Sequence, residues 1–248
     1  MYSNSYVFRY AAIMVLLVAA VLSAAALVLK PAQDRNIAVA KMQGILAAAH
    51  IEATAKNAEE LYAGSITEEI VIDKNGEVTS LYRNGQFETG DVRAFYVDLK
   101  KELYNKATGK DFKLPIYVAD KKGDRIYIIP LLGKGLWGPI YGNIALGGDF
   151  NTIKGATFGH DKETPGLGAE IELDFFENQF IGKKILDDAG NFTSVKVVKG
   201  GAAVLPPQEQ IHGVDAISGG TITSNGVSEM LKSNLENYIG YINKHKNI

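Results

Sequence analysis

The chain has 248 residues, of which 46% are hydrophobic and 22% are charged, and its formal net charge at pH 7 is −2. This balance is typical of a chain that folds, and it leaves no basic excess to neutralise a phosphate backbone, so we expect no nucleic-acid partner. Cysteine is absent. The chain itself therefore cannot hold a disulfide or an iron–sulfur cluster, and any redox chemistry requires a bound organic cofactor.

A membrane anchor is the first element that the sequence predicts. Residues 10–29 carry no charge, and as a helix they would be roughly 30 Å long, about the thickness of the hydrocarbon core of a bilayer. A cleaved signal peptide is the alternative, because small residues follow Ser23, but the apolar run is longer than the ~7–15 residues of a signal core. We therefore predict a retained single-span anchor with its flank over residues 1–35, in which Pro31 ends the helix, and a soluble domain over residues 36–248.

Helical periodicity predicts helices at both ends of the soluble domain. Between Asn36 and Ala49 the apolar residues recur every three or four positions. A short second helix is expected after Asn57, which has the form of an N-cap with a glutamate at the third helical position. The clearest helix covers residues 227–242, and Thr223 or Ser224 is expected to cap it.

Antiparallel strands are predicted between these helices, because β-prone runs there are separated by turn signals such as Asp73–Gly76. The expected strands cover residues 66–72, 77–82, 114–119, 125–131, 141–146, 153–158 and 194–198. Residues 174–184 alternate less regularly and are open to a helical interpretation. Helices at the ends and antiparallel strands between them predict one domain of the α+β class.

Glycine is concentrated between Lys121 and Gly168, and this region also holds Trp137, the only tryptophan of the chain. A dense group of glycines allows backbone amides to approach a ligand closely. Taken by itself, however, a tryptophan among glycines is predicted to pack in the core.

The segment Asp215–Ser224 precedes the last predicted helix and has the features of an anion site. The first amides of a helix have no partner within the helix, the helix dipole is positive there, and Gly219 and Gly220 permit a tight turn. The alternative is an ordinary helix start with a Ser or Thr cap after a glycine turn. Local chemistry alone leaves both interpretations open.

Two motifs, taken together, resemble the signatures of the FMN-binding domain family. One is His160-Asp-Lys-Glu-Thr-Pro-Gly-Leu-Gly168, and the other is Asp215-x-x-Ser-Gly-x-Thr221. They occur in the family's order, and the resemblance covers essentially the whole chain. Gly220 stands where the family usually has alanine, and since glycine is the smaller residue we expect it to leave the threonine hydroxyl accessible.

The resemblance implies that FMN is joined through its phosphate to the hydroxyl of Thr221 by a phosphoester bond, which a separate flavin transferase makes. Asp215 would assist the transferase or fix the turn by accepting backbone hydrogen bonds. The residues expected to border the phosphate are Ser218, Gly219 and Gly220. The residues expected near the flavin ring are Glu163, Thr164, Gly166, Leu167, Gly168 and Trp137. No catalytic residue and no metal ligand are expected.

A second Gly-Ala-Thr sequence, Gly155-Ala156-Thr157, matches the family's last three motif residues more literally. However, Lys154 stands at its serine position and Asn151 at its aspartate position, and the segment lies in a predicted strand. We therefore assign the flavin to Thr221, with Thr223 as a weaker candidate.

The resemblance further implies an electron relay in the bacterial inner membrane, with the soluble domain on the periplasmic side. The expected partners are the other subunits of a Na⁺-translocating NADH:quinone reductase complex, through which electrons pass toward quinone. Two alternatives remain at this point. One is the homologous FMN subunit of an Rnf ferredoxin:NAD⁺ complex, and the other is a membrane-anchored scaffold without a cofactor.

Overall fold

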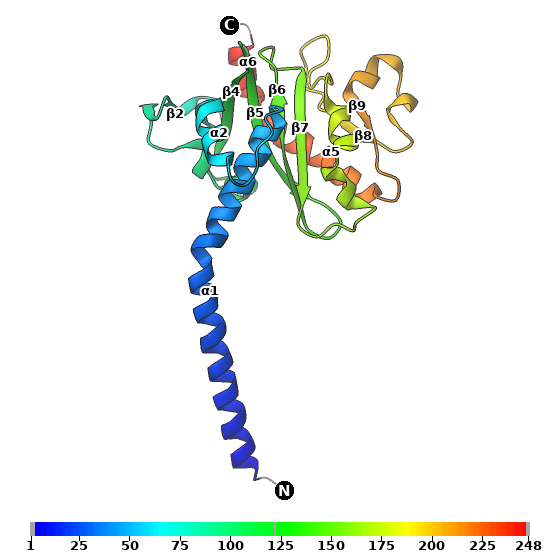
Figure 1. Cartoon of the computed structure of the whole chain (residues 1–248). Helices are drawn as coiled ribbons and strands as arrows, with labels where there is room; N and C mark the ends of the chain where they lie inside the picture. Colours follow the sequence, from blue (N-terminus) through cyan, green and yellow to red (C-terminus); the bar gives the residue numbers. More distant parts are fainter. Residues whose placement is uncertain (1–2, 122, 247–248) are drawn as a thin grey trace. The chain divides into compact units, whose positions relative to one another are not determined.

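The computed structural model describes residues 3–121 and 123–246 and is shown in Figure 1. The chain divides into two compact units, Met1–Lys41 and Met42–Ile248. The second unit contains both motifs that the sequence singles out.

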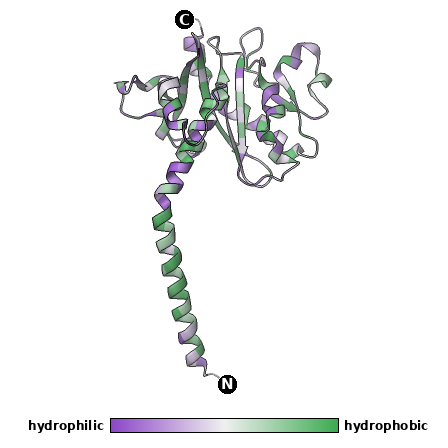
Figure 2. Cartoon of the chain, viewed as in Figure 1, coloured by the Kyte–Doolittle hydropathy of each residue, from purple (hydrophilic) through white to green (hydrophobic). Residues whose placement is uncertain are grey.

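One long helix, α1, runs from Asn4 to Ala48 and includes both the predicted anchor and the predicted amphipathic segment. It is long and apolar enough to cross a membrane, and Figure 2 shows its hydrophobic stretch. The expectation that Pro31 ends the helix is wrong, since Pro31 lies inside it. Proline removes a backbone N–H and crowds the preceding turn, but the helix continues on both sides of it, and Lys30 Nζ and Asp34 Oδ1 form an exposed ion pair (2.7 Å) across this position.

A seven-stranded antiparallel sheet forms the centre of the second unit, with the strand order β3-β2-β1-β4-β5-β6-β7. The strands are β1 (Ile66–Asp73), β2 (Val78–Arg83), β3 (Gln86–Thr89), β4 (Lys113–Lys121), β5 (Asp124–Lys134), β6 (Pro139–Leu146) and β7 (Ile153–His160). The α+β class is confirmed, as are the predicted strands from residue 66 to residue 158.

The remaining elements are short, apart from one helix. The helices are α2 (Ala58–Ser65), α3 (Leu99–Ala107), α4 (Asp174–Glu177), α5 (Thr221–Leu235) and α6 (Ile239–His245). Short 3-10 segments are Ala94–Tyr96, Gly168–Glu172, Asn178–Phe180, Ala202–Val204, Pro207–His212 and Glu236–Tyr238. The strands β8 (Lys196–Val198) and β9 (Gly213–Asp215) form a separate parallel pair.

The last predicted helix differs from the observed one at both ends. The observed helix α5 begins at Thr221, and a 3-10 turn separates it from α6. This turn places Tyr238 in the core, where its hydroxyl donates to the Pro115 carbonyl (3.1 Å). The predicted caps Thr223 and Ser224 are wrong, because both hydroxyls are engaged elsewhere and Gly220 is the residue before the helix.

Successive side chains of a strand point to opposite sides of the sheet, and here both faces are covered. Ile70 and Ile72 belong to the core cluster that α5 closes. Glu69 lies on the other face, where the hydroxyl of Tyr62 in α2 donates to it (3.1 Å). The end of α1 is also fastened to the sheet, because Thr157 Oγ1 in β7 donates to a carbonyl of its last turns at 3.1 Å.

Helix α5 is held against β5 by close backbone approach and by one buried side chain. A Cβ at Gly226 would lie 2.4 Å from the Lys134 carbonyl oxygen, so only glycine permits this contact. Asn234 is 3% exposed and bonds both the amide (3.1 Å) and the carbonyl (3.0 Å) of Leu132. These contacts fix where the first turn of α5 lies.

Candidate functional site

The first turn of α5 follows a tight glycine turn. Gly219 has a φ of +75°, a conformation that L side chains rarely adopt. A Cβ there would also lie 2.6 Å from Cδ2 of Leu167 in the other motif. The turn is closed by hydrogen bonds from the Gly220 amide to the Ile217 carbonyl (3.1 Å) and from the Ser224 amide to the Gly220 carbonyl (2.9 Å). The two motifs are therefore in direct contact.

The hydroxyl groups of this first turn have different surroundings. Thr223 is 2% exposed and donates to Glu163 Oε2 at 2.6 Å. Ser224 is fully buried, and its Oγ accepts the Ile217 amide at 3.2 Å. Thr221, the first helical residue, is exposed, as is Ser218 before the turn. Among the three hydroxyl-bearing residues of the helix start, only Thr221 is exposed to solvent.

Glu163 joins three segments that are distant in sequence. Its Oε2 accepts from Thr223, and its Oε1 accepts the backbone N–H of Trp137 at 2.8 Å. Its own amide donates to Nδ1 of His160 at 3.2 Å, which gives His160 a structural role. The side chain is 5% exposed. The predicted site residues Trp137, Glu163 and Gly168 are thus brought together with the start of α5.

The loop after Glu163 folds over the glycine turn. The amides of Leu167 and Ala169 both donate to the Thr164 carbonyl, at 3.1 and 3.2 Å. Gly166 has a φ of +75°, and its amide donates to Glu170 Oε1 at 3.1 Å. Thr164, Gly166 and Leu167 are exposed, whereas Gly168 is buried against Glu163 and Thr223.

Trp137 is not a core residue, so that sequence-based expectation is wrong. Its side chain is 63% exposed, and its contact with Glu163 is made by the backbone amide and not by the ring. Leu136, Leu167 and Ile222 also expose large apolar side chains in the segments that make the site. Exposed apolar groups of this kind suit a flat aromatic ligand.

Asp215 lies in β9 and stabilises a turn. Its Oδ1 accepts the Ala202 amide at 2.6 Å, and its own amide donates to Gln179 Oε1 at 2.7 Å. The carboxylate is exposed. The carboxylate thus accepts a backbone hydrogen bond as expected, but from Ala202 and not from the turn at residues 217–220.

Glu177, in α4, is a carboxylate with a raised pKa. Burial raises the pKa of Glu177 in α4 to about 7, and the nearby charges of Asp174 and Glu172 act in the same direction. The Phe158 amide donates to Glu177 at 2.6 Å and partly offsets the effect. Glu177 therefore changes its charge near neutral pH.

The alternative Gly-Ala-Thr sequence lies in β7. Thr157 Oγ1 donates to the Gly44 carbonyl at 3.1 Å and accepts from Asn143 Nδ2 at 3.2 Å. This hydroxyl fastens the end of α1 to the sheet, so the structure supports setting Thr157 aside as an attachment residue.

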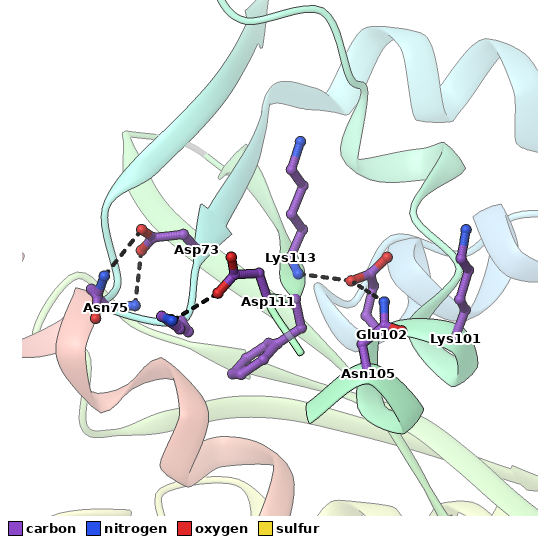
Figure 3. Close-up of a pocket in the computed structure, with 9 residues that line it drawn as sticks. Asp73, Asn75, Lys101, Glu102, Asn105, Asp111 and Lys113 are labelled. Carbon is purple, nitrogen blue, oxygen red and sulfur yellow. Dashed lines mark hydrogen bonds and ion pairs between the residues drawn. The ribbon is translucent and has the colours of Figure 1, made fainter. Parts of the chain in front are cut away.

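A pocket of about 480 Å³ lies elsewhere, between the β1–β2 turn and α3 (Figure 3). Two of its charged side chains form an ion pair, and a third accepts a backbone amide. Lys74 Nζ lies 2.7 Å from Asp111 Oδ1, and Glu102 accepts the Lys113 amide at 2.9 Å. The pocket contains no residue of either motif, so it does not contribute to the candidate site.

Sequence reasoning misses the structural role of two residues that build the site. The sequence predicts Thr223 only as a cap or a weaker attachment point, whereas its bond to Glu163 spans 60 residues of sequence. Asn234 belongs to no motif at all. A polar residue on the apolar face of the last helix is the available signal.

Comparisons of the sequence and of the structure with known proteins point to the same family. The model of the FMN-binding domain family matches residues 135–236. The C subunit of the Na(+)-translocating NADH-quinone reductase of Vibrio vulnificus is 36% identical over 216 residues, which cover 84% of this chain and 81% of that protein. The protein of the same name from Haemophilus ducreyi is 32% identical, over 86% of this chain and 82% of that protein. A crystal structure of this subunit from Parabacteroides distasonis superimposes with a TM-score of 0.73 at 39% identity, over 86% of this chain and 96% of that one.

Proposed function

Because the chain belongs to the C-subunit family of Na(+)-translocating NADH-quinone reductases, an oxidoreductase complex, we propose that it carries FMN on Thr221 through a phosphoester bond. Electrons would pass through this flavin between redox groups of partner subunits toward quinone. The relatives carry the quinone-reductase name and the matching domain model is an FMN-binding one, so we do not propose the Rnf or scaffold alternatives.

The observation that carries this proposal is the difference between the hydroxyls of α5. Thr221 is exposed at the first helical position, whereas Thr223 and Ser224 are buried and hydrogen-bonded. An ester at Thr221 would place its phosphate beside the free amides of the first turn of a 15-residue helix. The residues present therefore fit a phosphate-linked group.

The chain's own residues would hold and orient the flavin. Gly219 and Gly220 keep side chains away from the turn, and Asp215 fixes the strand that leads into it. The exposed side chains of Leu167 and Trp137 offer apolar surface to a ring. When bound, FMN supplies the ability to accept and release electrons, which this chain has no other group to provide.

Covalent attachment has a physical use if the domain lies on the periplasmic side of the inner membrane, as we propose. Free FMN is scarce outside the cytoplasm, so a dissociated flavin would not be replaced. A covalent bond removes this loss and leaves hydrogen bonding and burial to set the reduction potential. It also requires a flavin transferase as a maturation partner.

The decisive experiment is Thr221→Ala in cells that contain the transferase. Wild-type protein should give a flavin-fluorescent band on a denaturing gel, and peptide mapping by mass spectrometry should place the added group on residue 221. Thr221→Ala should fold but remain dark, and Thr157→Val should stay fluorescent as the matched control. A fluorescent Thr221→Ala protein would contradict the assignment, as would a bare residue 221 in wild type.

A further inference from the structure

A buried carboxylate lies beside the proposed attachment residue. Glu163 accepts from Thr223, which stands two residues after Thr221 in the first turn of α5. Its other oxygen accepts the Trp137 amide. These bonds span 60 and 26 residues of sequence. One side chain therefore ties the β5–β6 turn and the loop at residues 160–168 to the helix that presents Thr221.

Two glycines provide the space for this carboxylate. A Cβ at Gly135 would lie 2.5 Å from Glu163 Oε1, and a Cβ at Gly168 would lie 2.5 Å from Oε2. Both distances are shorter than atoms can approach without displacement. The carboxylate therefore fills a cavity that any larger residue at either position would close.

The charge of Glu163 is held by neutral donors. Both oxygens accept hydrogen bonds, as in an ionised carboxylate. Across residues 3–121 and 123–246, no lysine, arginine or histidine forms an ion pair with it. The amide dipoles of the first turn of α5 favour a negative charge at this place. An unpaired buried charge still costs free energy, so its presence beside the site points to a use for the charge itself.

We propose, on the basis of FMN attachment to Thr221, that Glu163 is a positioning residue of the flavin site and that its fixed negative charge lowers the reduction potential of the flavin. Each added electron makes the flavin more negative unless a proton follows it. A carboxylate bonded to the helix turn that carries Thr221 opposes that change, and because it is buried, salt screens it weakly.

The test compares Glu163→Gln with wild type in the flavinylated full-length protein. Glutamine keeps both contacts, since its Oε1 can accept the Trp137 amide and its Nε2 can donate to the Thr223 oxygen. We expect the flavin to remain attached, as judged by intact mass, and its midpoint potential in a spectroscopic redox titration to rise. Asp161→Asn is the matched control, because it removes one exposed charge from the same loop and should shift the potential much less.

The positioning role is measured without the flavin, in full-length protein that carries Thr221→Ala. Hydrogen–deuterium exchange of residues 134–140 should be slow in this background, and it should stay slow when Glu163→Gln is added. Adding Glu163→Ala instead should make the exchange fast, because the Trp137 amide then loses its acceptor. Equal exchange with the Gln and Ala substitutions overturns the positioning role.

The electrostatic role and the attachment fail on different results. An unchanged potential in flavinylated Glu163→Gln, or a shift of equal size in Asp161→Asn, overturns the electrostatic role. A bare residue 221 in wild type instead overturns the attachment itself, so the two proposals are distinguishable.

Discussion

Three glutamates in the described part of the domain are almost completely buried, Glu68, Glu69 and Glu163, and the last two are held in different ways. Glu69 in β1 is 2% exposed, pairs with the Arg93 guanidinium, and also accepts from the Tyr62 hydroxyl and the Phe95 amide. Glu163 is 5% exposed and accepts only from an amide and a hydroxyl. A cation beside a buried carboxylate cancels its field at a distance, whereas neutral donors leave most of that field in place. The first arrangement suits a structural cross-link, and the second suits a group that acts on a neighbour.

The largest effect is expected when Glu69 loses its cation. Arg93→Ala should lower the free energy of unfolding by about 3–5 kcal/mol, because it leaves a buried carboxylate with neutral donors only. Urea unfolding followed by tyrosine and tryptophan fluorescence measures the change. Arg93→Lys, which keeps the charge, should lose less. If Arg93→Ala unfolded at the same urea midpoint as wild type, Glu69 would need no cation. Glu69 and Glu163 would then not differ in the way proposed.

A smaller effect is expected when Glu163 loses one donor. Thr223→Val removes the hydroxyl and leaves one carboxylate oxygen unpaired, which should destabilise the domain by roughly 1.5–3 kcal/mol. Thr223→Ser keeps the hydroxyl and serves as the control. The same urea titration distinguishes them. Equal stability of the Val and Ser variants would mean that the 2.6 Å bond contributes nothing to the fold.

The smallest effect concerns Glu177, a carboxylate with a single amide donor and acidic neighbours. Its pKa is raised to about 7 in the folded protein from 4.5. The folded state therefore keeps a proton that the unfolded chain loses, and stability should fall as the pH rises from 4.5 to 7. After allowance for its partial exposure we expect a loss of about 1–2 kcal/mol.

Glu177→Gln should remove this pH dependence, since glutamine still accepts the Phe158 amide but cannot ionise. Thermal unfolding across the interval between the two pKa values measures it, with Glu170→Gln, a change in the same segment, as the control. The raised pKa of Glu177 would be refuted if the melting temperature of wild type rose between pH 4.5 and 7 and that of Glu177→Gln rose in parallel.

Much of the fold could be predicted because the relevant signals are local. Turn residues such as those at Asp73–Gly76 separate β-prone runs, and the paired strands follow from them. Helix α3 has no buried residue and all four residues of β3 are exposed. Neither element is predicted from the sequence, although α3 carries Leu99, Leu103 and Ala107 at helical spacing. Pro31 does not break the helix as predicted, and prolines are tolerated in long apolar helices of the kind that cross membranes.

The sequence proposes the members of the candidate site but does not assemble them. The motifs identify Thr221 and Glu163, and the structure brings their segments into contact. The motif cannot reveal that Glu163 uses its carboxylate on Thr223 and Trp137, because those contacts depend on the docking of α5 against β5. The exposure of Trp137 is also hidden from the sequence, because it depends on which segments pack around residue 137 in the folded domain.

The order of these segments along the chain has a consequence for biosynthesis. The hydrophobic part of α1 leaves the ribosome well before α5, which needs β5 and the loop at residues 160–168 before its first turn can take its place. A newly made chain can thus be committed to the membrane long before Thr221 exists as a folded acceptor. Any enzyme that modifies this threonine in its folded setting must work after α5 has been made and has docked, on whichever side of the membrane the domain has already reached.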